Sequence, residues 1–374
     1  MSTYDYDLHG YFRLRLENAT SKEAQMVQRQ VGPLAAPVAG EPDLTVQFVE
    51  SIPEPPDLRY IGLNDAAYSD QAFYVLKGKN KARVKVQIPF DEIGQQATIC
   101  CERGLSSIPL LIPIINLSLL AKGILAFHAS AFTFRGQGAL ITGWAKGGKT
   151  ETLLAFMSQG ARYVGDEWIY LRADENEMFG IPEPMRVWNW HLYSLPHYRA
   201  RLKRKDQLRL NSLDALSRSM GWLAGSNGQR RGTPARLAQR IQPVVNRQMF
   251  AHFAPHALFG PDNIQPASRI DKLFFAVSHN APEVSVAPID AEEVVQRMLF
   301  SLTEEQAVLT SYYQKFRFAF PQKCNSWIDN IERIQSKLLL RALNDIPAYA
   351  VYHPYPVHIP RLFEAMQVLF EELR

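Results

Sequence analysis

Residues 139–156 have the sequence ALITGWAKGGKTETLLAF. An apolar, strand-like run ends at Gly143, two further glycines follow, and the apolar residues after Lys149-Thr150 recur at helical spacing. A strand, a glycine-rich turn and a helix in this order are typical of a P-loop. We therefore expect an α/β domain with a nucleotide-binding loop at residues 143–150.

The residue types in this turn suit a triphosphate. Glycines let backbone N–H groups surround an anion, and the following helix directs its positive end at the same place. Lys149 supplies a cation, and the hydroxyl of Thr150 can ligate magnesium. We predict that ATP and Mg²⁺ bind here. The predicted nucleotide-binding residues are Gly143, Lys146, Gly147, Gly148, Lys149, Thr150 and Glu151.

Polar residues of the types that act in catalysis flank the loop on both sides. His128 lies in the strand-like run 124–134, and Asp166-Glu167 follow Thr150 by sixteen residues, just before the strand-like run 168–171. Two acids at the same edge of a sheet as a P-loop suit two roles. One can hold Mg²⁺ or its water, and the other can accept the proton of an attacking hydroxyl.

These segments resemble a known family. His128-Ala-Ser, the P-loop Gly143-x4-Gly148-Lys149-Thr150-Glu151-Thr152 and the later run Gly160-Ala-Arg-x2-Gly-Asp166-Glu167 are similar to the catalytic core of the HPr kinase/phosphorylase family. The P-loop of that family also resembles that of phosphoenolpyruvate carboxykinase. The likeness covers residues 123–171. It implies a P-loop kinase domain of the HPr kinase/phosphoenolpyruvate carboxykinase type.

The resemblance also implies a role for each matching residue. Lys149 would contact the β- and γ-phosphates, and Asp166 would be the catalytic base. His128 would lie beside the transferred phosphoryl group, and Thr150 and Glu167 would hold the metal. The family usually has a second Asp where this chain has Glu167, so the charge is kept on a longer side chain.

A later signature of the family, Leu-Glu-Ile-Arg-Gly, has no good copy in this chain. Residues 181–186, Ile-Pro-Glu-Pro-Met-Arg, lie in about the right place without matching it. We therefore expect Glu183 to be a surface carboxylate rather than a metal ligand.

Composition places the chain among ordinary globular proteins, with 47% hydrophobic and 21% charged residues. Its three cysteines match neither a metal-site spacing nor a disulfide framework, so we expect reduced thiols and a cytoplasmic protein. The most apolar run, residues 108–120, is interrupted by Pro113 and Asn116 and is too short to span a bilayer. We expect a buried helix there and no membrane partner.

Period-two alternation divides the chain into two parts. Residues 1–104 contain strand-like runs at 11–16, 44–49, 82–88 and 96–101, which predict a β-rich N-terminal domain. Residues 105–374 alternate strands with helices and are expected to form the P-loop domain. Near the end, residues 353–358, His-Pro-Tyr-Pro-Val-His, invite a metal-site interpretation, but two prolines favour a rigid connector.

A strongly basic insertion is predicted at about residues 197–250. Residues 199–247 contain twelve Lys or Arg against two acids, whereas the net charge of the whole chain is only +4. The insertion could form an electropositive lid or a docking surface for an acidic partner. A solvated helical insertion is an open alternative, and no nucleic-acid recognition motif accompanies the charge.

The leading functional hypothesis is an ATP-dependent kinase that phosphorylates a serine-type hydroxyl of a protein, peptide or small molecule. A non-catalytic nucleotide-binding regulator is the first alternative, and a carboxykinase-like lyase is the second. The hypotheses differ at Asp166, because a regulator has no use for a base that faces a hydroxyl. We also expect a homo-oligomer.

Overall fold

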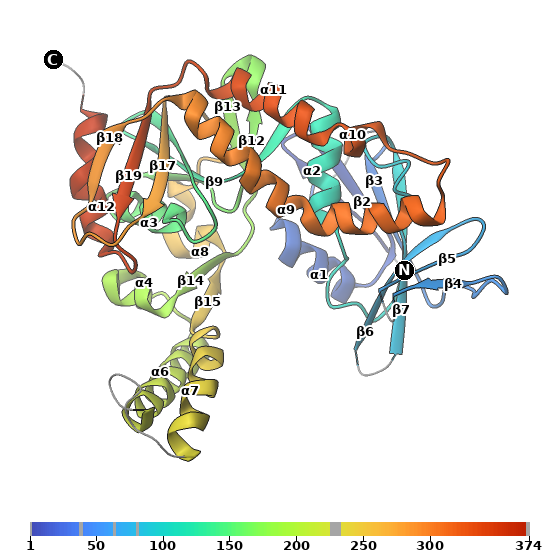
Figure 1. Cartoon of the computed structure of the whole chain (residues 1–374), viewed down its shortest axis with the longest axis horizontal. Coiled ribbons are helices and arrows are strands. Elements are labelled where there is room, and N and C mark those ends of the chain that lie inside the picture. Colours follow the sequence, from blue (N-terminus) through green and yellow to red (C-terminus); the bar gives the residue numbers. More distant parts are fainter. Residues whose placement is uncertain (1, 37–39, 63–64, 80–81, 225–232, 372–374) are drawn as a thin grey trace.

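The computed structural model describes residues 2–36, 40–62, 65–79, 82–224 and 233–371. It shows a mixed α/β structure with two large sheets, which are connected by long helices (Figure 1). We call them the N-terminal sheet, built from β1 to β8, and the P-loop sheet, which contains the strand before residue 143. The predicted α/β class is confirmed at this level.

The N-terminal sheet has eight strands in the order β1-β2-β3-β8-β7-β6-β5-β4. Their bounds are β1 Ser2–Leu8, β2 Phe12–Ala19, β3 Leu44–Val49, β4 Arg59–Ile61, β5 Ala66–Tyr68, β6 Phe73–Lys79, β7 Ala82–Gln87 and β8 Ala97–Glu102. The four strands predicted from alternation correspond to β2, β3, β7 and β8. One helix, α1 (Ser21–Val31), begins with a capping box between Thr20 and Glu23.

The P-loop sheet has the strand order β16-β13-β12-β9-β10-β17-β19-β18, and β11 also pairs with β9. The bounds are β9 Ile124–Phe134, β10 Gln137–Thr142, β11 Arg162–Gly165, β12 Trp168–Arg172, β13 Glu177–Gly180, β16 Ala267–Arg269, β17 Lys272–Ser278, β18 Ser285–Pro288 and β19 Ala348–His353. The pairs β10–β17 and β17–β19 are parallel, whereas β9 is antiparallel to both β10 and β12. Residues that follow β10 and β19 therefore meet at the same edge.

The strand β10 leads through residues 143–148 into α3 (Lys149–Met157), as predicted. This helix is buried between the sheet and the C-terminal helix α12 (Ile359–Met366). The ring of Phe156 stacks on that of Phe132 in β9, with centroids 4.4 Å apart. Apolar contacts therefore fix the direction in which α3 leaves the P-loop.

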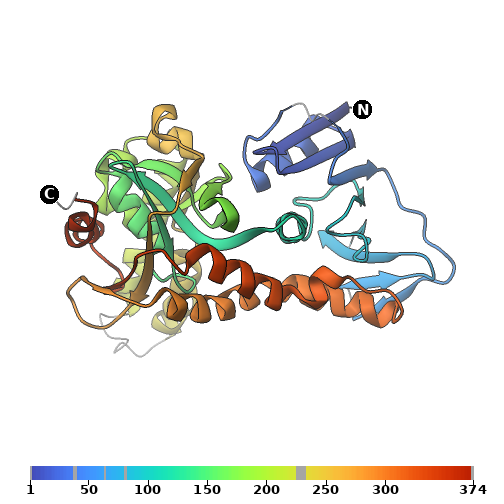
Figure 2. The same ribbon diagram turned by 90° about the horizontal axis from the view of Figure 1, so that it is seen from above.

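Three helices connect the two sheets, namely α2 (Leu111–Ala121), α9 (Ala291–Ala319) and α11 (Ile331–Leu343). The helix α9 is unbroken from Ala291 to Ala319. No proline or glycine interrupts it before Pro321. In Figure 2, α9 runs from the P-loop sheet to the N-terminal sheet, and it contacts β9, β5 and β6.

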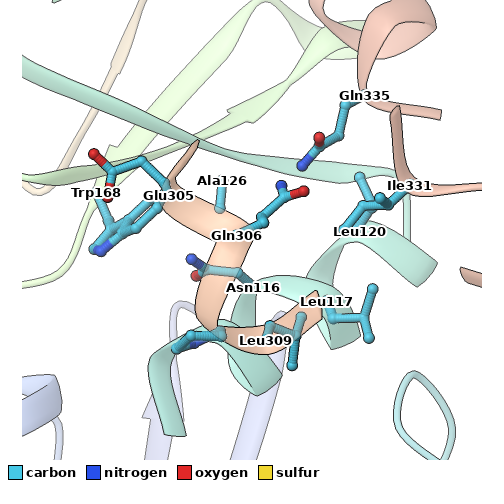
Figure 3. A pocket seen from close by; sticks show the side chains of 11 residues that line it. Asn116, Leu117, Leu120, Ala126, Trp168, Glu305, Gln306, Leu309, Ile331 and Gln335 are labelled. Carbon is cyan, nitrogen blue, oxygen red and sulfur yellow. The ribbon is translucent and has the colours of Figure 1, made fainter. Parts of the chain in front are cut away.

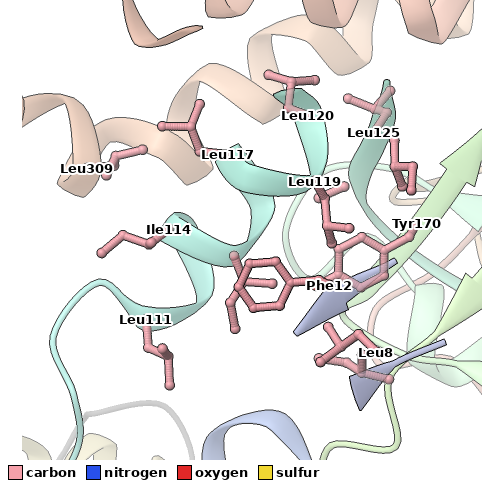
Figure 4. Close-up of a cluster of buried hydrophobic side chains, with 14 of the residues drawn as sticks. Leu8, Phe12, Leu111, Ile114, Leu117, Leu119, Leu120, Leu125, Tyr170 and Leu309 are labelled. Carbon is pink, nitrogen blue, oxygen red and sulfur yellow. The ribbon is translucent and has the colours of Figure 1, made fainter. Parts of the chain in front are cut away.

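The apolar core is continuous across the two sheets. Leu8 and Phe12 of the N-terminal sheet belong to the same buried cluster as Leu119 of α2 and Leu125 and Tyr170 of the P-loop sheet (Figure 4). Burial of these side chains in one cluster stabilises the two sheets against each other. The boundary predicted at residue 104 thus separates two sheets that share one core.

The basic insertion forms a helical hairpin of α6 (Arg204–Ala224) and α7 (Thr233–Asn246), which extends from the body of the protein in Figure 1. A two-stranded ribbon, β14 (Met185–Trp188) and β15 (Phe250–Phe253), joins it to the rest. Arg230 and Arg231, which belong to the predicted basic lid, lie outside the described residues. Across the described ranges, none of the helices has both the length and the apolar character needed to cross a membrane.

Candidate functional site

The P-loop backbone requires glycine at two positions. Gly143 has φ +146°, and a Cβ atom there would lie 2.5 Å from the carbonyl oxygen of Ala276 in β17. Gly148 has φ +107°, and a Cβ atom there would lie 2.1 Å from Nε2 of His353, which itself lies 2.8 Å from the carbonyl oxygen of Gly147. Any larger residue would be strained at both positions. His353, at the end of β19, thus packs directly against the loop.

Lys149, the first residue of α3, folds back over the loop. Its Nζ donates to the carbonyl oxygens of Gly143 at 3.0 Å and Trp144 at 3.1 Å. The side chain is buried, and this burial lowers the pKa of Lys149, although nearby carboxylates oppose the change. A bound polyphosphate would offer charged acceptors in place of these carbonyls.

Thr150 and Asp166 are in direct contact. The Thr150 hydroxyl lies 3.2 Å and 3.1 Å from the two carboxyl oxygens of Asp166 and donates to them. Asp166 is almost completely buried, and this burial, followed by the negative charge of Glu167, raises the pKa of Asp166 to about 8. A carboxyl group with a pKa near neutrality can gain and lose a proton at physiological pH, as a general base must.

Glu167 and His128 form the next contact along this edge. Glu167 has φ +69°, an uncommon backbone conformation for a residue with a long side chain. Its Oε2 lies 3.2 Å from Nε2 of His128, which β9 places opposite Trp168. The turn between β11 and β12 therefore directs Asp166 to Thr150 and Glu167 to His128. The structure brings these four predicted residues together.

A second carboxylate reaches His128 from α9. The Oε1 atom of Glu305 lies 2.6 Å from Nδ1 of His128. Burial alone would lower the pKa of His128, but the carboxylates of Glu167 and Glu305 outweigh it and raise the pKa. His128 is therefore held between two acids, one on each ring nitrogen. Glu305 is a site residue that the sequence did not indicate.

Glu305 also borders a small inner cavity between α2, α9 and α11. Figure 3 shows Glu305 beside Trp168, with Gln306 from the same helix and Asn116 from α2. The far wall includes Leu120 and other apolar side chains. The helix α9 therefore contacts His128 through Glu305 and also lines the inner cavity.

We expect Glu305→Gln to lower the pKa of His128, because one of its two carboxylate neighbours becomes neutral. A histidine with a raised pKa in the folded state stabilises the protein at acidic pH, and this stabilisation is lost as the pH rises through that pKa. The melting temperature of the variant should therefore fall more at pH 5.5 than at pH 9. NMR titration of labelled histidines measures the pKa.

Glu304→Gln is the matched control for this prediction, because Glu304 is the exposed neighbour of Glu305 on the same helix. It should leave the titration of His128 unchanged. An unaltered His128 pKa in Glu305→Gln would contradict the proposed ion pair.

The expectation that Glu183 is a surface carboxylate is wrong. The side chain is only partly exposed, and its Oε1 atom is buried without a hydrogen-bond partner among the described residues. Burial, followed by the charges of Glu167 and Asp166, raises the pKa of Glu183 well above its usual range. The carboxyl group of Glu183 is therefore near enough to the acid pair for their charges to affect its pKa.

Glu151 faces the opposite side of α3. Its Oε1 lies 3.0 Å from Nε2 of the buried His191 in α4 (Asn189–Ser194), and the Trp188 N–H donates to Nδ1 at 3.3 Å. Because Nδ1 accepts, the proton of the neutral ring is on Nε2, which donates to Glu151. Burial alone would raise the pKa of Glu151, but the hydrogen bond from His191 outweighs it and lowers the pKa.

These contacts line one open cleft of about 440 Å³. This volume lies within the usual range of small-molecule sites. The predicted residues in its wall are His128, Lys146, Gly147, Gly148, Lys149, Thr150, Glu151, Asp166 and Glu167. Gly143 takes part through its carbonyl oxygen, which accepts from Lys149.

Further residues that were not predicted as site residues come from four distant segments. They are Arg186 and Trp188 from β14, Trp190 and His191 from α4, Asn246 and Arg247 at the end of α7, and Tyr355 after β19. Arg186 belongs to the run 181–186, Asn246 and Arg247 to the predicted basic insertion, and Tyr355 to the predicted connector 353–358. None of these segments was predicted to line the site.

The predicted magnesium site consists of Thr150 and Glu167. Over the described ranges, no group of three or more His, Cys, Asp or Glu side chains is arranged to hold a metal ion without other ligands. Magnesium that binds together with a nucleotide needs fewer protein groups, because phosphate oxygens and water complete its shell. The hydroxyl of Thr150 and the neighbouring carboxylates are ligands of the type that Mg²⁺ prefers.

A scan against protein-family models finds no match to this chain, and a search of curated proteins finds none either. The functional conclusion therefore depends on the residues of the cleft.

Proposed function

We propose that the protein is an ATP-dependent phosphotransferase that phosphorylates a hydroxyl group. The observation that supports this best is the contact between Thr150 of the P-loop and the buried Asp166. A P-loop alone would support nucleotide binding without phosphoryl transfer. A carboxyl group of raised pKa beside the loop adds a group that can accept a proton from the acceptor.

In the proposed reaction, the loop amides and Lys149 bind the β- and γ-phosphates, and Lys149 exchanges its carbonyl partners for phosphate oxygens. Asp166 orients the acceptor hydroxyl and takes its proton as the oxygen attacks the γ-phosphorus. The bond to the β-phosphate oxygen then breaks, which leaves ADP and a phosphate ester. His128, flanked by Glu167 and Glu305, provides positive charge beside the transferred group.

Thr150 and Glu167 would hold Mg²⁺, which would neutralise charge on the phosphates. Glu183 lies close enough for the charges of Asp166 and Glu167 to raise its pKa. We infer that it contributes to the balance of charge at this edge.

The acceptor is proposed to enter past Arg186 and Arg247, which line the same cleft. Among the described basic residues of the insertion, Arg247 at the base of the helical hairpin is the one in the cleft wall. An acceptor with an acidic group close to its hydroxyl fits this entrance.

The test is a search for a mass gain of about 80 Da, the mass added by phosphorylation. Proteins and metabolites produced together with this chain are incubated with the purified protein and MgATP. We expect one or a few acceptors to gain this mass with the parent protein and none with Asp166→Asn. ATP binding without any acceptor would instead favour the nucleotide-binding regulator.

A further inference from the structure

The cleft has two chemically different ends, and the start of α3 lies between them. Thr150 contacts Asp166 at one end, which also contains His128 and Glu167. The next residue, Glu151, contacts His191 at the other end. We call these the carboxylate end and the aromatic end.

The aromatic end consists of Trp190, His191 and Tyr355. The rings of Trp190 and Tyr355 meet edge to face, with centroids 5.9 Å apart and planes at 83°. Tyr355 is 55% exposed, so much of this large ring is open to solvent inside the cleft. Two perpendicular rings form a corner that can hold a flat ring by one face and one edge.

His191 supports the Trp190 ring of this corner. His191 packs against Trp190 with centroids 4.2 Å apart and planes at 71°. His191 is buried, and two hydrogen bonds fix its orientation, because Nε2 donates to Glu151 and Nδ1 accepts from the Trp188 N–H. The chain of contacts therefore connects the P-loop helix to the position of the Trp190 ring.

The direction of the bound triphosphate follows from these two ends. Its terminal phosphate belongs at the carboxylate end, where Lys149 and Asp166 can act on it. The remainder of the nucleotide then extends past Glu151 to the aromatic end. A purine is planar and apolar on both faces, and aromatic side chains bind such rings by stacking.

We propose that Trp190 and Tyr355 form the nucleobase site, and that Glu151 and His191 are positioning residues for it. Glu151, predicted as a nucleotide ligand, would then act through His191 instead of contacting phosphate. This inference rests on the proposed nucleotide binding and adds the site that distinguishes ATP from a bare polyphosphate.

Calorimetric titration with two probes, MgATP and magnesium tripolyphosphate, tests the proposal. Both probes offer phosphates to the P-loop, but only ATP has a base. We expect Trp190→Ala and Tyr355→Ala each to raise the Kd for ATP by about 5- to 100-fold, the range for loss of one stacking partner. The Kd for tripolyphosphate should stay unchanged, and Trp190→Phe should restore most of the ATP affinity.

Tyr193→Ala is the matched control for Tyr355→Ala. Tyr193 lies on α4 with similar exposure, 52%, but it donates to Asp214 and is not among the cleft residues. It should bind both probes like the parent. Glu151→Gln should weaken ATP binding without weakening tripolyphosphate binding.

Three results would overturn the nucleobase site alone. The first is an equal loss of affinity for both probes in Trp190→Ala, and the second is an unchanged affinity for ATP in that variant. The third is a parent protein that binds ATP no more tightly than tripolyphosphate. A parent that binds neither probe would overturn the proposed function, and the nucleobase site with it. The two failures are therefore distinguishable before any acceptor is known.

Discussion

Replacing Asp166 with asparagine should reduce phosphoryl transfer by about two to four orders of magnitude, the range expected for loss of a positioned general base. The amide can still accept from the Thr150 hydroxyl, so the P-loop should keep its shape. It cannot take the proton of the acceptor. Single-turnover measurements with saturating MgATP separate this chemical step from nucleotide binding, which should change little.

The same variant has an independent readout in pH-dependent stability. The pKa of Asp166 is about 8 in the folded protein and about 3.9 in an unfolded chain. The folded state therefore binds this proton more tightly, and the resulting stabilisation is fully present below about pH 4 and is lost progressively as the pH rises to about 8. Between these two pH values, the melting temperature of the parent should fall more than that of Asp166→Asn. Parent-like transfer in Asp166→Asn would favour the regulator hypothesis.

Loss of the Lys149 ammonium should lower transfer at least about a hundredfold, because one preorganised electrostatic contact to the transferred group commonly contributes that much. Lys149→Ala removes this cation and leaves a buried space beside the carbonyls of Gly143 and Trp144. Thr150→Ala should act in the same direction by removing a metal ligand. Titration with MgATP and steady-state kinetics measure both effects.

Lys146→Ala is the control for this prediction. Lys146 lies in the same loop and lines the cleft, but it has no hydrogen bond or ion pair within the part of the chain that the structure describes. It should lose far less activity than Lys149→Ala. If Lys149→Ala and Thr150→Ala both bind and turn over ATP like the parent, the P-loop assignment fails.

The P-loop and its flanking strands could be predicted because their signal is local. The spacing of Gly143, Gly148 and Lys149 is contiguous in sequence, and the runs on either side have clear periods. The acid pair Asp166-Glu167 could be predicted as well, because it lies at a fixed distance of sixteen residues after Thr150. Other local signals were present but were not used. Thr20 and Glu23 form a capping box at the start of α1, and the residues of β1 alternate in polarity.

The remainder of the site could not be predicted, because it depends on contacts between distant segments. Glu305 lies on a helix far along the chain from His128 and has no motif. No sequence pattern distinguishes Trp190 and Tyr355 from other aromatic residues. They come together because of where β14 and β19 end in the fold. Glu183 was expected at the surface because its segment does not match the family signature, whereas its Oε1 atom is buried.

The helix α9 spans the distance between the cleft and the N-terminal sheet. Glu305 contacts His128, and about 15 Å further along the same helix Lys315 forms an ion pair with Asp65. The Tyr312 hydroxyl donates to the same carboxylate at 2.7 Å. One unbroken helix therefore keeps a fixed separation between the side chain that contacts His128 and the side chains that contact Asp65.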